Sequence, residues 1–258
     1  MNKSINISLI VTLFLIPSPA KAGEIHVAAA SNFTGAAKVL AGRFEEKTGH
    51  KVVLVLGSTG KHYAQIKNGA PFEVFLAADA GRPELLEKDK IAVPGTRFTY
   101  AIGRLVLWSP NEGYVDRKGA VLENGKYKFL ALANPKLAPY GEAAKEVLQG
   151  RRLWEKLAGR LVQGENISQA LQFVIAGNAE LGFVALSQII QPGSPLKGSY
   201  WMIPQCLYRP IEQQAVLLKD TETARAFLLF IKCDAARSLI RSHGYDTPVE
   251  ILNEVKHE

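Results

Sequence analysis

The stretch KVVLVLGSTGKHYAQIKNGAPFEVFLAA, residues 51–78, holds two apolar runs separated by a short, more polar segment. Residues 51–56 and 73–78 have the length and the apolar content of buried strands. Between them, residues 59–68 fit a short helix that Gly69 would end. A strand, a helix and a second strand at this spacing predict a parallel pair joined by a crossover helix.

The same alternation extends on both sides of this stretch. Residues 24–30, EIHVAAA, predict another strand, and residues 83–88 predict a further helix. A helix that ends at Gly49 is expected after the first strand, because apolar side chains recur there at helical spacing: Phe33, Ala36, Ala37, Leu40, Ala41 and Phe44. The sequence therefore predicts a parallel sheet, whose ligands bind beyond the carboxyl ends of the strands.

A second set of alternating elements follows residue 102. The expected strands are 103–110, 127–135, 179–186 and 213–218, and the expected helices begin near Glu142, begin after Asn166, and span 221–232 and 234–243. The fold class is thus α/β, with two lobes that each contain a mostly parallel sheet flanked by helices. No segment has the composition of a flexible linker, so we expect the chain to cross between lobes more than once. The predicted organisation is a first lobe at 23–102, a second at 103–212 and a return to the first at 213–258.

Residues 1–22 have the three parts of a secretory signal peptide. Lys3 gives a positive start, residues 5–16 form an apolar run, and residues 20–22, Ala-Lys-Ala, supply a cleavage site. The apolar run is shorter than the roughly 20 residues that a membrane-spanning helix needs. We therefore expect an exported, periplasmic protein.

Charge and cysteine content exclude several classes of partner. Without Lys3 and Lys21, the 31 basic and 24 acidic residues of the chain leave a mature net charge of +5, spread without basic runs, so nucleic acid is not expected to bind. Cys206 and Cys233 suit an oxidising compartment, and the sequence leaves their pairing open. No metal site is expected, because the histidines are isolated: His26, His50, His62, His243 and His257.

Residues 57–61, GSTGK, admit three interpretations. A phosphate loop needs Gly six residues before its Lys and Ser or Thr after it, but those positions hold Val55 and His62. Ser58 and Lys61 match the S-x-x-K motif of penicillin-recognising serine enzymes, yet the KTG at 47–49 precedes the serine and the third motif of that family is missing. The third interpretation is an anion cradle at a helix N-terminus.

Ser31 and Ser58 both lie where a predicted strand gives way to a helix. The first N–H groups of a helix lack partners within it, and its dipole favours negative charge at that end. Small hydroxyl side chains let an oxyanion approach and add donors. One such residue alone is better explained as an ordinary N-cap. Together with Tyr140 and the helix start at Asn166 and Ile167, the two serines predict a cradle of neutral donors for a tetrahedral oxyanion.

Four segments carry a family resemblance: VAAASNFTGAAKVLAGRFEEKTG, GSTGKHYAQIKNGAPFEVFLAAD, ANPKLAPYGEAAKEVL and LGFV. With them the sequence resembles the periplasmic molybdate-binding proteins of ABC importers, the ModA family, over essentially the whole mature chain. The resemblance implies a type II periplasmic binding protein that is not an enzyme and holds its ligand in the cleft between the lobes. It further implies a monomer, without a cofactor, that binds molybdate or tungstate and passes it to an ABC transporter permease.

The resemblance also implies ligand contacts from five positions: Ser31, Asn32, Ser58, Tyr140 and the backbone N–H of Ile167. Many members of the family carry a tyrosine directly after LGxV, where this chain has Ala185, and Tyr140 is expected to supply the phenol instead. Two alternatives stay open from the sequence. One is a binding protein for another oxyanion such as sulfate, and the other is an exported serine hydrolase that uses Ser58 and Lys61.

Overall fold

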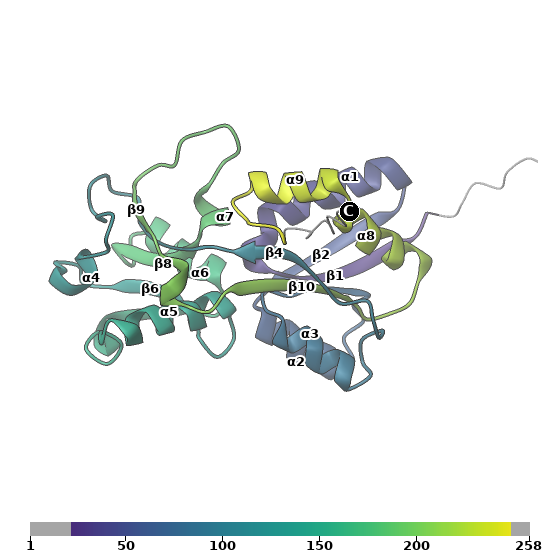
Figure 1. Cartoon of the computed structure of the whole chain (residues 1–258), viewed down its shortest axis with the longest axis horizontal. Coiled ribbons are helices and arrows are strands. Elements are labelled where there is room, and N and C mark those ends of the chain that lie inside the picture. The colour runs from purple at the N-terminus through teal and green to yellow at the C-terminus, as the bar shows by residue number, and fades with distance from the viewer. Residues whose placement is uncertain (1–21, 249–258) are drawn as a thin grey trace, which may run out of the picture.

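The structure is a computed structural model that describes residues 22–248. The expected signal peptide therefore lies, apart from its last residue, outside the described residues. Two five-stranded sheets, each covered by helices, form two lobes that lie side by side (Figure 1). This arrangement confirms the predicted fold class.

The first sheet has the strand order β2-β1-β3-β10-β4. Strands β1, β2 and β3 run parallel, whereas β10 pairs antiparallel with β3 on one side and with β4 on the other. The bounds are β1 (Glu24–Ala30), β2 (Lys51–Gly57), β3 (Val74–Leu76), β4 (Phe98–Gly103) and β10 (Ile211–Leu217). The parallel arrangement predicted around residues 51–78 is thus confirmed.

The second sheet repeats this plan with the order β7-β6-β8-β5-β9. Here β7, β6 and β8 run parallel, and β5 pairs antiparallel with β8 and with β9. The bounds are β5 (Leu105–Ser109), β6 (Leu130–Ala133), β7 (Leu161–Gly164), β8 (Leu181–Ala185) and β9 (Ser199–Met202). In both lobes, three parallel strands therefore send their carboxyl ends to one edge of the sheet.

Helices cover both faces of each sheet, and alternate strand residues point to opposite layers. In β1, Val27 and Ala29 pack on one side with α1, α8 and α9, while Ala28 packs on the other with α2 and α3. The helices of the first lobe are α1 (Thr34–Thr48), α2 (Thr59–Lys67), α3 (Gly81–Lys88), α8 (Glu222–Lys232) and α9 (Asp234–Ser242). Those of the second are α4 (Val121–Asn124), α5 (Pro139–Gly150), α6 (Ile167–Ile175) and α7 (Leu186–Ile189).

The helix predicted to begin near Glu142 starts earlier, at Pro139. Proline fits the first helical position, because its fixed φ suits a helix and its missing N–H needs no partner there. This shift places Tyr140 within the first turn of α5 rather than in the preceding loop. The N-terminus of α5 therefore lies at Tyr140, one of the predicted ligand residues.

Two strands carry the chain between the lobes. β4 leads through Arg104 directly into β5, and β10 returns the chain from the second sheet to the first (Figure 1). The pairing of β10 with β4 shifts register between Gln213 and Gln214, as a β-bulge does. The bulge lies at the point where the two lobes meet.

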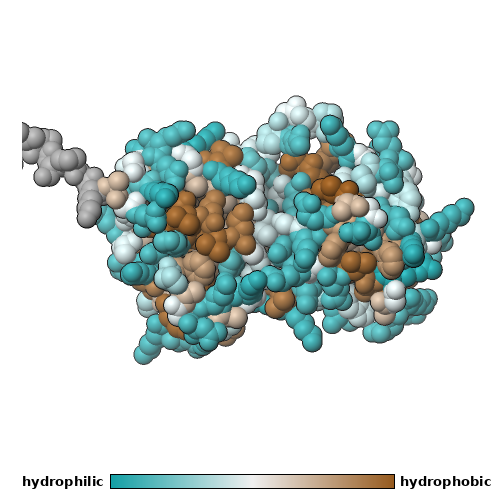
Figure 2. Space-filling model, turned by 180° about the vertical axis from the view of Figure 1, so that it is seen from behind, coloured by the Kyte–Doolittle hydropathy of each residue, from teal (hydrophilic) through white to brown (hydrophobic). Residues whose placement is uncertain are grey.

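The exposed surface mixes hydrophilic side chains with smaller apolar areas. On the face opposite to Figure 1, apolar patches lie on both lobes among hydrophilic side chains (Figure 2). Within residues 22–248, no helix combines the length and the apolar character needed to cross a bilayer. Cys206 and Cys233, whose pairing the sequence left open, are both exposed free thiols.

Candidate anion-binding site

Strand-to-helix junctions from both lobes line one small cavity. The ends of β1, β2 and β3 contribute from the first lobe, and the N-termini of α5 and α6 contribute from the second. The lining residues are Ala30, Ser31, Asn32, Gly57, Ser58, Thr59, Ala78, Ala138, Pro139, Tyr140, Asn166 and Ile167. All five residues singled out by sequence therefore lie together at this cavity.

None of these lining residues carries a charged side chain. The cavity is instead lined by hydroxyls, two side-chain amides and the N-termini of helices, groups that can present hydrogen-bond donors. Within the described part of the chain, no group of three or more His, Cys, Asp or Glu side chains could hold a metal ion. The arrangement is thus suited to an anion held by neutral donors.

Ser58 is the N-cap of α2 and is 2% exposed. Its Oγ accepts a long hydrogen bond, 3.4 Å, from the backbone N–H of Lys61, so the hydroxyl hydrogen remains available to a ligand. The Oγ1 of Thr59, which also lines the cavity, accepts from the N–H of Ala78 at 2.9 Å and is held by that bond against the end of β3. Ser58 provides the hydroxyl donor that the sequence predicted on this loop.

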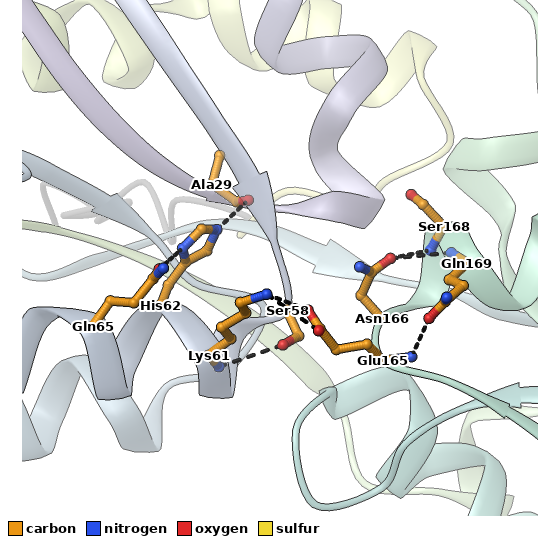
Figure 3. A network of polar contacts seen from close by, with 9 residues as sticks. All are labelled: Ala29, Ser58, Lys61, His62, Gln65, Glu165, Asn166, Ser168 and Gln169. Atoms are coloured by element: carbon orange, nitrogen blue, oxygen red, sulfur yellow. Dashed lines mark hydrogen bonds and ion pairs between the residues drawn. The ribbon is translucent and has the colours of Figure 1, made fainter.

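Asn166 caps α6 in a way that leaves one donor unused. Its Oδ1 accepts from the N–H groups of Ser168 at 3.0 Å and Gln169 at 3.1 Å (Figure 3). The N–H of Ile167, the first residue of the helix, has no partner within the helix because of its position. This is the backbone donor that the resemblance implied at Ile167.

Tyr140 is almost fully buried, at 1% exposed, in the first turn of α5. Its hydroxyl accepts from Nε2 of Gln213 at 3.2 Å. Burial raises the pKa of this phenol well above its usual 10.0, so the group stays protonated and able to donate. Ala185, the position at which the resemblance implied a tyrosine in many members of the family, is a buried residue at the end of β8.

Ser31 and Asn32 form the short helical turn that follows β1. The Asn32 side chain is already committed, because Nδ2 donates to Oε1 of Gln213 at 2.8 Å and to the hydroxyl of Tyr245 at 3.0 Å. That side chain therefore has no amide hydrogen left for an anion. Any donor that Asn32 offers to the cavity is its backbone N–H.

Hydrogen bonds between the lobes surround the cavity. The N–H of Gly60 donates to the carbonyl of Leu137 at 2.8 Å, and the hydroxyl of Ser168 donates to the carbonyl of Ser31 at 3.1 Å. A Cβ at Gly60 would lie only 2.9 Å from the Leu137 oxygen. Glycine is thus the residue that lets α2 approach the second lobe this closely.

Lys61 is an exposed residue that forms an ion pair across the lobes. Its Nζ lies 3.2 Å from both carboxylate oxygens of Glu165 in the second lobe, and both side chains are about half exposed (Figure 3). An ammonium held by this carboxylate is not presented to Ser58 as a catalytic base would be. The pair instead joins the lobes beside the cavity.

The ring of His62 packs against the loop that carries Ser58. It is 2% exposed, with Nε2 3.2 Å from the carbonyl oxygen of Ala29 and Nδ1 3.0 Å from Oε1 of Gln65 (Figure 3). A Cβ at Gly57 would lie 2.9 Å from Nε2, so the ring packs directly on the loop. Burial lowers the pKa of His62 below its usual 6.5, and the hydrogen bonds to Gln65 and Ala29 offset this only in part.

Sequence reasoning missed the contacts that join these junctions. The approach of Gly60 to Leu137 was not predicted. Gln213, which touches both Tyr140 and Asn32, received no role. The only signal for it was a pair of amides, Gln213-Gln214, at the start of an apolar strand.

The geometry defines a class of protein: a two-lobed solute-binding protein with a site lined by hydrogen-bond donors between its lobes. Residues 25–246 match the family described as "Bacterial extracellular solute-binding protein". The chain is 52% identical to the molybdate-binding protein ModA of Azotobacter vinelandii, over 90% of this chain and 93% of that protein. It is 51% identical to ModA of Rhodobacter capsulatus, over 89% of this chain and 90% of that protein.

The chain also resembles the solved structure of the Azotobacter vinelandii periplasmic molybdate-binding protein, with a TM-score of 0.84 and 44% identity. That match covers 87% of this chain and 99% of the other. The chain therefore belongs to the bacterial extracellular solute-binding proteins and, within them, to the ModA family. The relatives are solute-binding proteins, which confirms the prediction of a binding protein rather than an enzyme.

The buried His62 predicts a pH-dependent stability. The pKa of His62 is lower in the folded protein than in the unfolded chain. Below pH 6.5 the unfolded chain therefore binds a proton at this histidine more readily than the folded protein does, and the free energy of unfolding falls as the pH falls. We expect wild type to lose more free energy of unfolding between pH 7 and pH 5 than His62→Gln, with a difference in slope of at most about 1.4 kcal/mol per pH unit. Urea unfolding at several pH values measures this. Parallel curves for the two proteins would show that His62 does not titrate differently on unfolding.

Proposed function

We propose that this chain is a periplasmic solute-binding protein that captures molybdate and passes it to the membrane permease of an ABC importer. The observation that carries the proposal is the cavity between the lobes, lined by neutral donors from strand-to-helix junctions. Support comes from ModA relatives at 52% and 51% identity, which are named for molybdate binding. Tungstate, an oxyanion of the same charge and shape, is proposed as a second ligand, and the protein is proposed to act as a monomer that binds no nucleic acid.

The chemistry of the cavity favours a fully deprotonated dianion. Burying a charge without partners is costly, and several charge-assisted hydrogen bonds together with helix dipoles offset that cost. A protonated phosphate would bring an O–H into a site made of donors and would leave it without an acceptor. Sulfate carries the same charge as molybdate on shorter bonds, so the size of the cavity is what would distinguish them.

We assign a donor to each of the five proposed ligand residues. Ser31 and Ser58 would donate through their hydroxyls, and Tyr140 through a phenol whose oxygen already accepts from Gln213. Asn32 and Ile167 would donate through backbone N–H groups, since the Asn32 amide is occupied elsewhere. Three donors then come from the first lobe and two from the second, so only closed lobes present all five.

Closure is the proposed basis of ligand capture. We propose that residues 23–102 and 213–258 form one lobe and residues 103–212 the other, with the crossing strands β4 and β10 as the hinge. An anion that takes donors from both lobes stabilises the closed state relative to the open one. The contacts between Gly60 and Leu137 and between Lys61 and Glu165 would form in the same motion.

The first test is calorimetric titration of the mature protein with molybdate, tungstate, sulfate and phosphate. Because the donors suit a deprotonated dianion, we expect tight binding of molybdate and tungstate and no measurable binding of phosphate. Sulfate has shorter bonds and should bind at least about 100-fold more weakly than molybdate, a difference near 2.7 kcal/mol. A preference for sulfate or phosphate would reject the molybdate assignment in favour of the alternative oxyanion.

The second test compares Ser58→Ala with Lys61→Ala. Losing a hydrogen bond to a charged ligand should weaken molybdate binding by roughly 1.5–3 kcal/mol in Ser58→Ala. Lys61→Ala removes only a half-exposed ion pair and should cost less than about 1 kcal/mol. A serine hydrolase would need both residues, so comparable losses in the two variants, or labelling of Ser58 by a fluorophosphonate, would speak for that alternative.

The third test is Gly60→Ala, with Gly42→Ala as its control. The new Cβ would crowd the Leu137 oxygen only when the lobes close, so affinity should fall by about 1–3 kcal/mol while the stability of the ligand-free protein is kept. Gly42 lies in α1, where an added Cβ would meet nothing within 4 Å, and its substitution should leave affinity unchanged. Wild-type affinity in Gly60→Ala would show that this contact is not part of the closed state.

A further inference from the structure

Gln213 is a fully buried amide at the boundary between the lobes. It lies on β10 beside the register shift, and its side chain is 0% exposed. The opposite position on β4 is Ala101, two residues before the chain leaves the first lobe at Gly103. A buried amide of this kind must find hydrogen-bond partners, since leaving one unpaired is costly.

The partners of Gln213 come from both halves of the cavity. Nε2 donates to the hydroxyl of Tyr140 in the second lobe at 3.2 Å, and Oε1 accepts from Nδ2 of Asn32 in the first lobe at 2.8 Å. Oε1 also accepts from the hydroxyl of Tyr100 at 3.1 Å. One side chain thus bonds to two residues that line the proposed anion site, one from each lobe.

The direction of these hydrogen bonds decides which donors remain available to an anion in the cavity. A hydroxyl has one hydrogen to donate, and the Tyr140 oxygen is already the acceptor for Gln213, so its hydrogen is directed to another acceptor. On the other side, Tyr245 donates to the carbonyl of Asn32 at 2.7 Å while the Asn32 amide donates to Gln213. Both residues are therefore fixed with their remaining donors free for an anion.

Tyr140 and Gln213 are packed tightly against the backbone of Gly103. A Cβ at Gly103 would lie 2.2 Å from the hydroxyl oxygen of Tyr140 and 2.8 Å from Nε2 of Gln213. Only glycine at this position lets the phenol and the amide meet beside the crossing strand. The sequence of β4 thus makes room for the contact between Tyr140 and Gln213.

We propose that Gln213 is a positioning residue for the oxyanion site, which directs the Tyr140 hydroxyl toward the ligand and fixes Asn32 beside it. This proposal rests on the proposed function only in requiring that an oxyanion binds in the cavity. Gln213 touches no ligand itself and acts through Tyr140 and Asn32. Oxyanion binding therefore depends on one amide that holds a residue from each lobe in place.

The neighbouring Gln214 offers a matched control. It is also an amide on β10, 8% exposed, and it bonds to Thr99 and Arg97 away from the cavity. Gln213→Met and Gln214→Met each replace a buried amide by an apolar side chain of similar length. We expect both variants to lose stability in urea unfolding, because each leaves partners unpaired.

Affinity separates the two variants. The test uses the oxyanion that wild type binds most tightly among molybdate, tungstate, sulfate and phosphate. We expect Gln213→Met to bind it about tenfold or more weakly, because the Tyr140 hydroxyl loses its fixed direction, and Gln214→Met to bind it as wild type does. Equal affinity in wild type and Gln213→Met would overturn the proposal, as would an equal loss in both variants.

A double-mutant cycle with Tyr140→Phe tests whether Gln213 affects anion affinity through the Tyr140 hydroxyl. If Gln213 acts mainly through the Tyr140 hydroxyl, the loss caused by Gln213→Met should shrink to less than about threefold in the Tyr140→Phe background. An undiminished loss would overturn the role through Tyr140. If Gln213→Met does not fold, Gln213→Asn replaces it, since the shorter amide keeps the chemistry but withdraws it from the phenol.

The cycle distinguishes this proposal from the assignment of molybdate. Binding of sulfate instead of molybdate rejects the proposed function, while the cycle with sulfate still decides the role of Gln213. Failure of all four oxyanions to bind would overturn both proposals.

Discussion

The cavity between the lobes offers only neutral donors, and this constraint shapes the rest of the structure. Without a cationic side chain, an oxyanion can be stabilised only if several N–H and O–H groups converge on it. Helix N-termini supply such groups in a fixed direction, and parallel strands bring several helix N-termini to one edge of a sheet. Two sheets with the same strand plan, facing each other at those edges, provide enough donors from opposite sides.

Convergence of this kind requires unusually close approach between backbones. Gly60 meets Leu137 across the lobes, and a Cβ on Gly141 in α5 would lie 2.2 Å from the carbonyl oxygen of Ala133. Gly57 accommodates the ring of His62, and Gly103 accommodates Tyr140 and Gln213. These glycines all have negative φ, so close packing rather than backbone freedom explains them. In GSTGK, Gly57 thus makes room for a ring of its own lobe and Gly60 for the backbone of the other lobe, and neither serves a phosphate loop.

The sequence predicted the parts of the fold that local pattern controls. Strands such as 24–30 and 51–56 are long and apolar, and their helices carry clear apolar faces, so periodicity was sufficient. Three strands, β4, β7 and β9, escaped prediction because each mixes polar with apolar side chains, and β7 and β9 have only four residues each. For the site, the small polar residues at helix starts could be chosen from sequence. The partners of Lys61, Asn32 and Tyr140 could not, since Glu165 and Gln213 lie between 73 and 181 residues away along the chain.

A site made of neutral donors from two lobes also suits a protein that must release what it binds. A lysine or arginine in the cavity would keep attracting the anion when the lobes separate, because its charge stays with one lobe. Neutral donors act only at hydrogen-bond distance, so opening removes the contribution of α5 and α6 at once and lets water replace it. The Lys61–Glu165 pair lies outside the cavity lining and would break in the same step. If the lobes close as proposed, affinity depends on closure itself, and a partner that separates the lobes would lower the affinity without touching the anion.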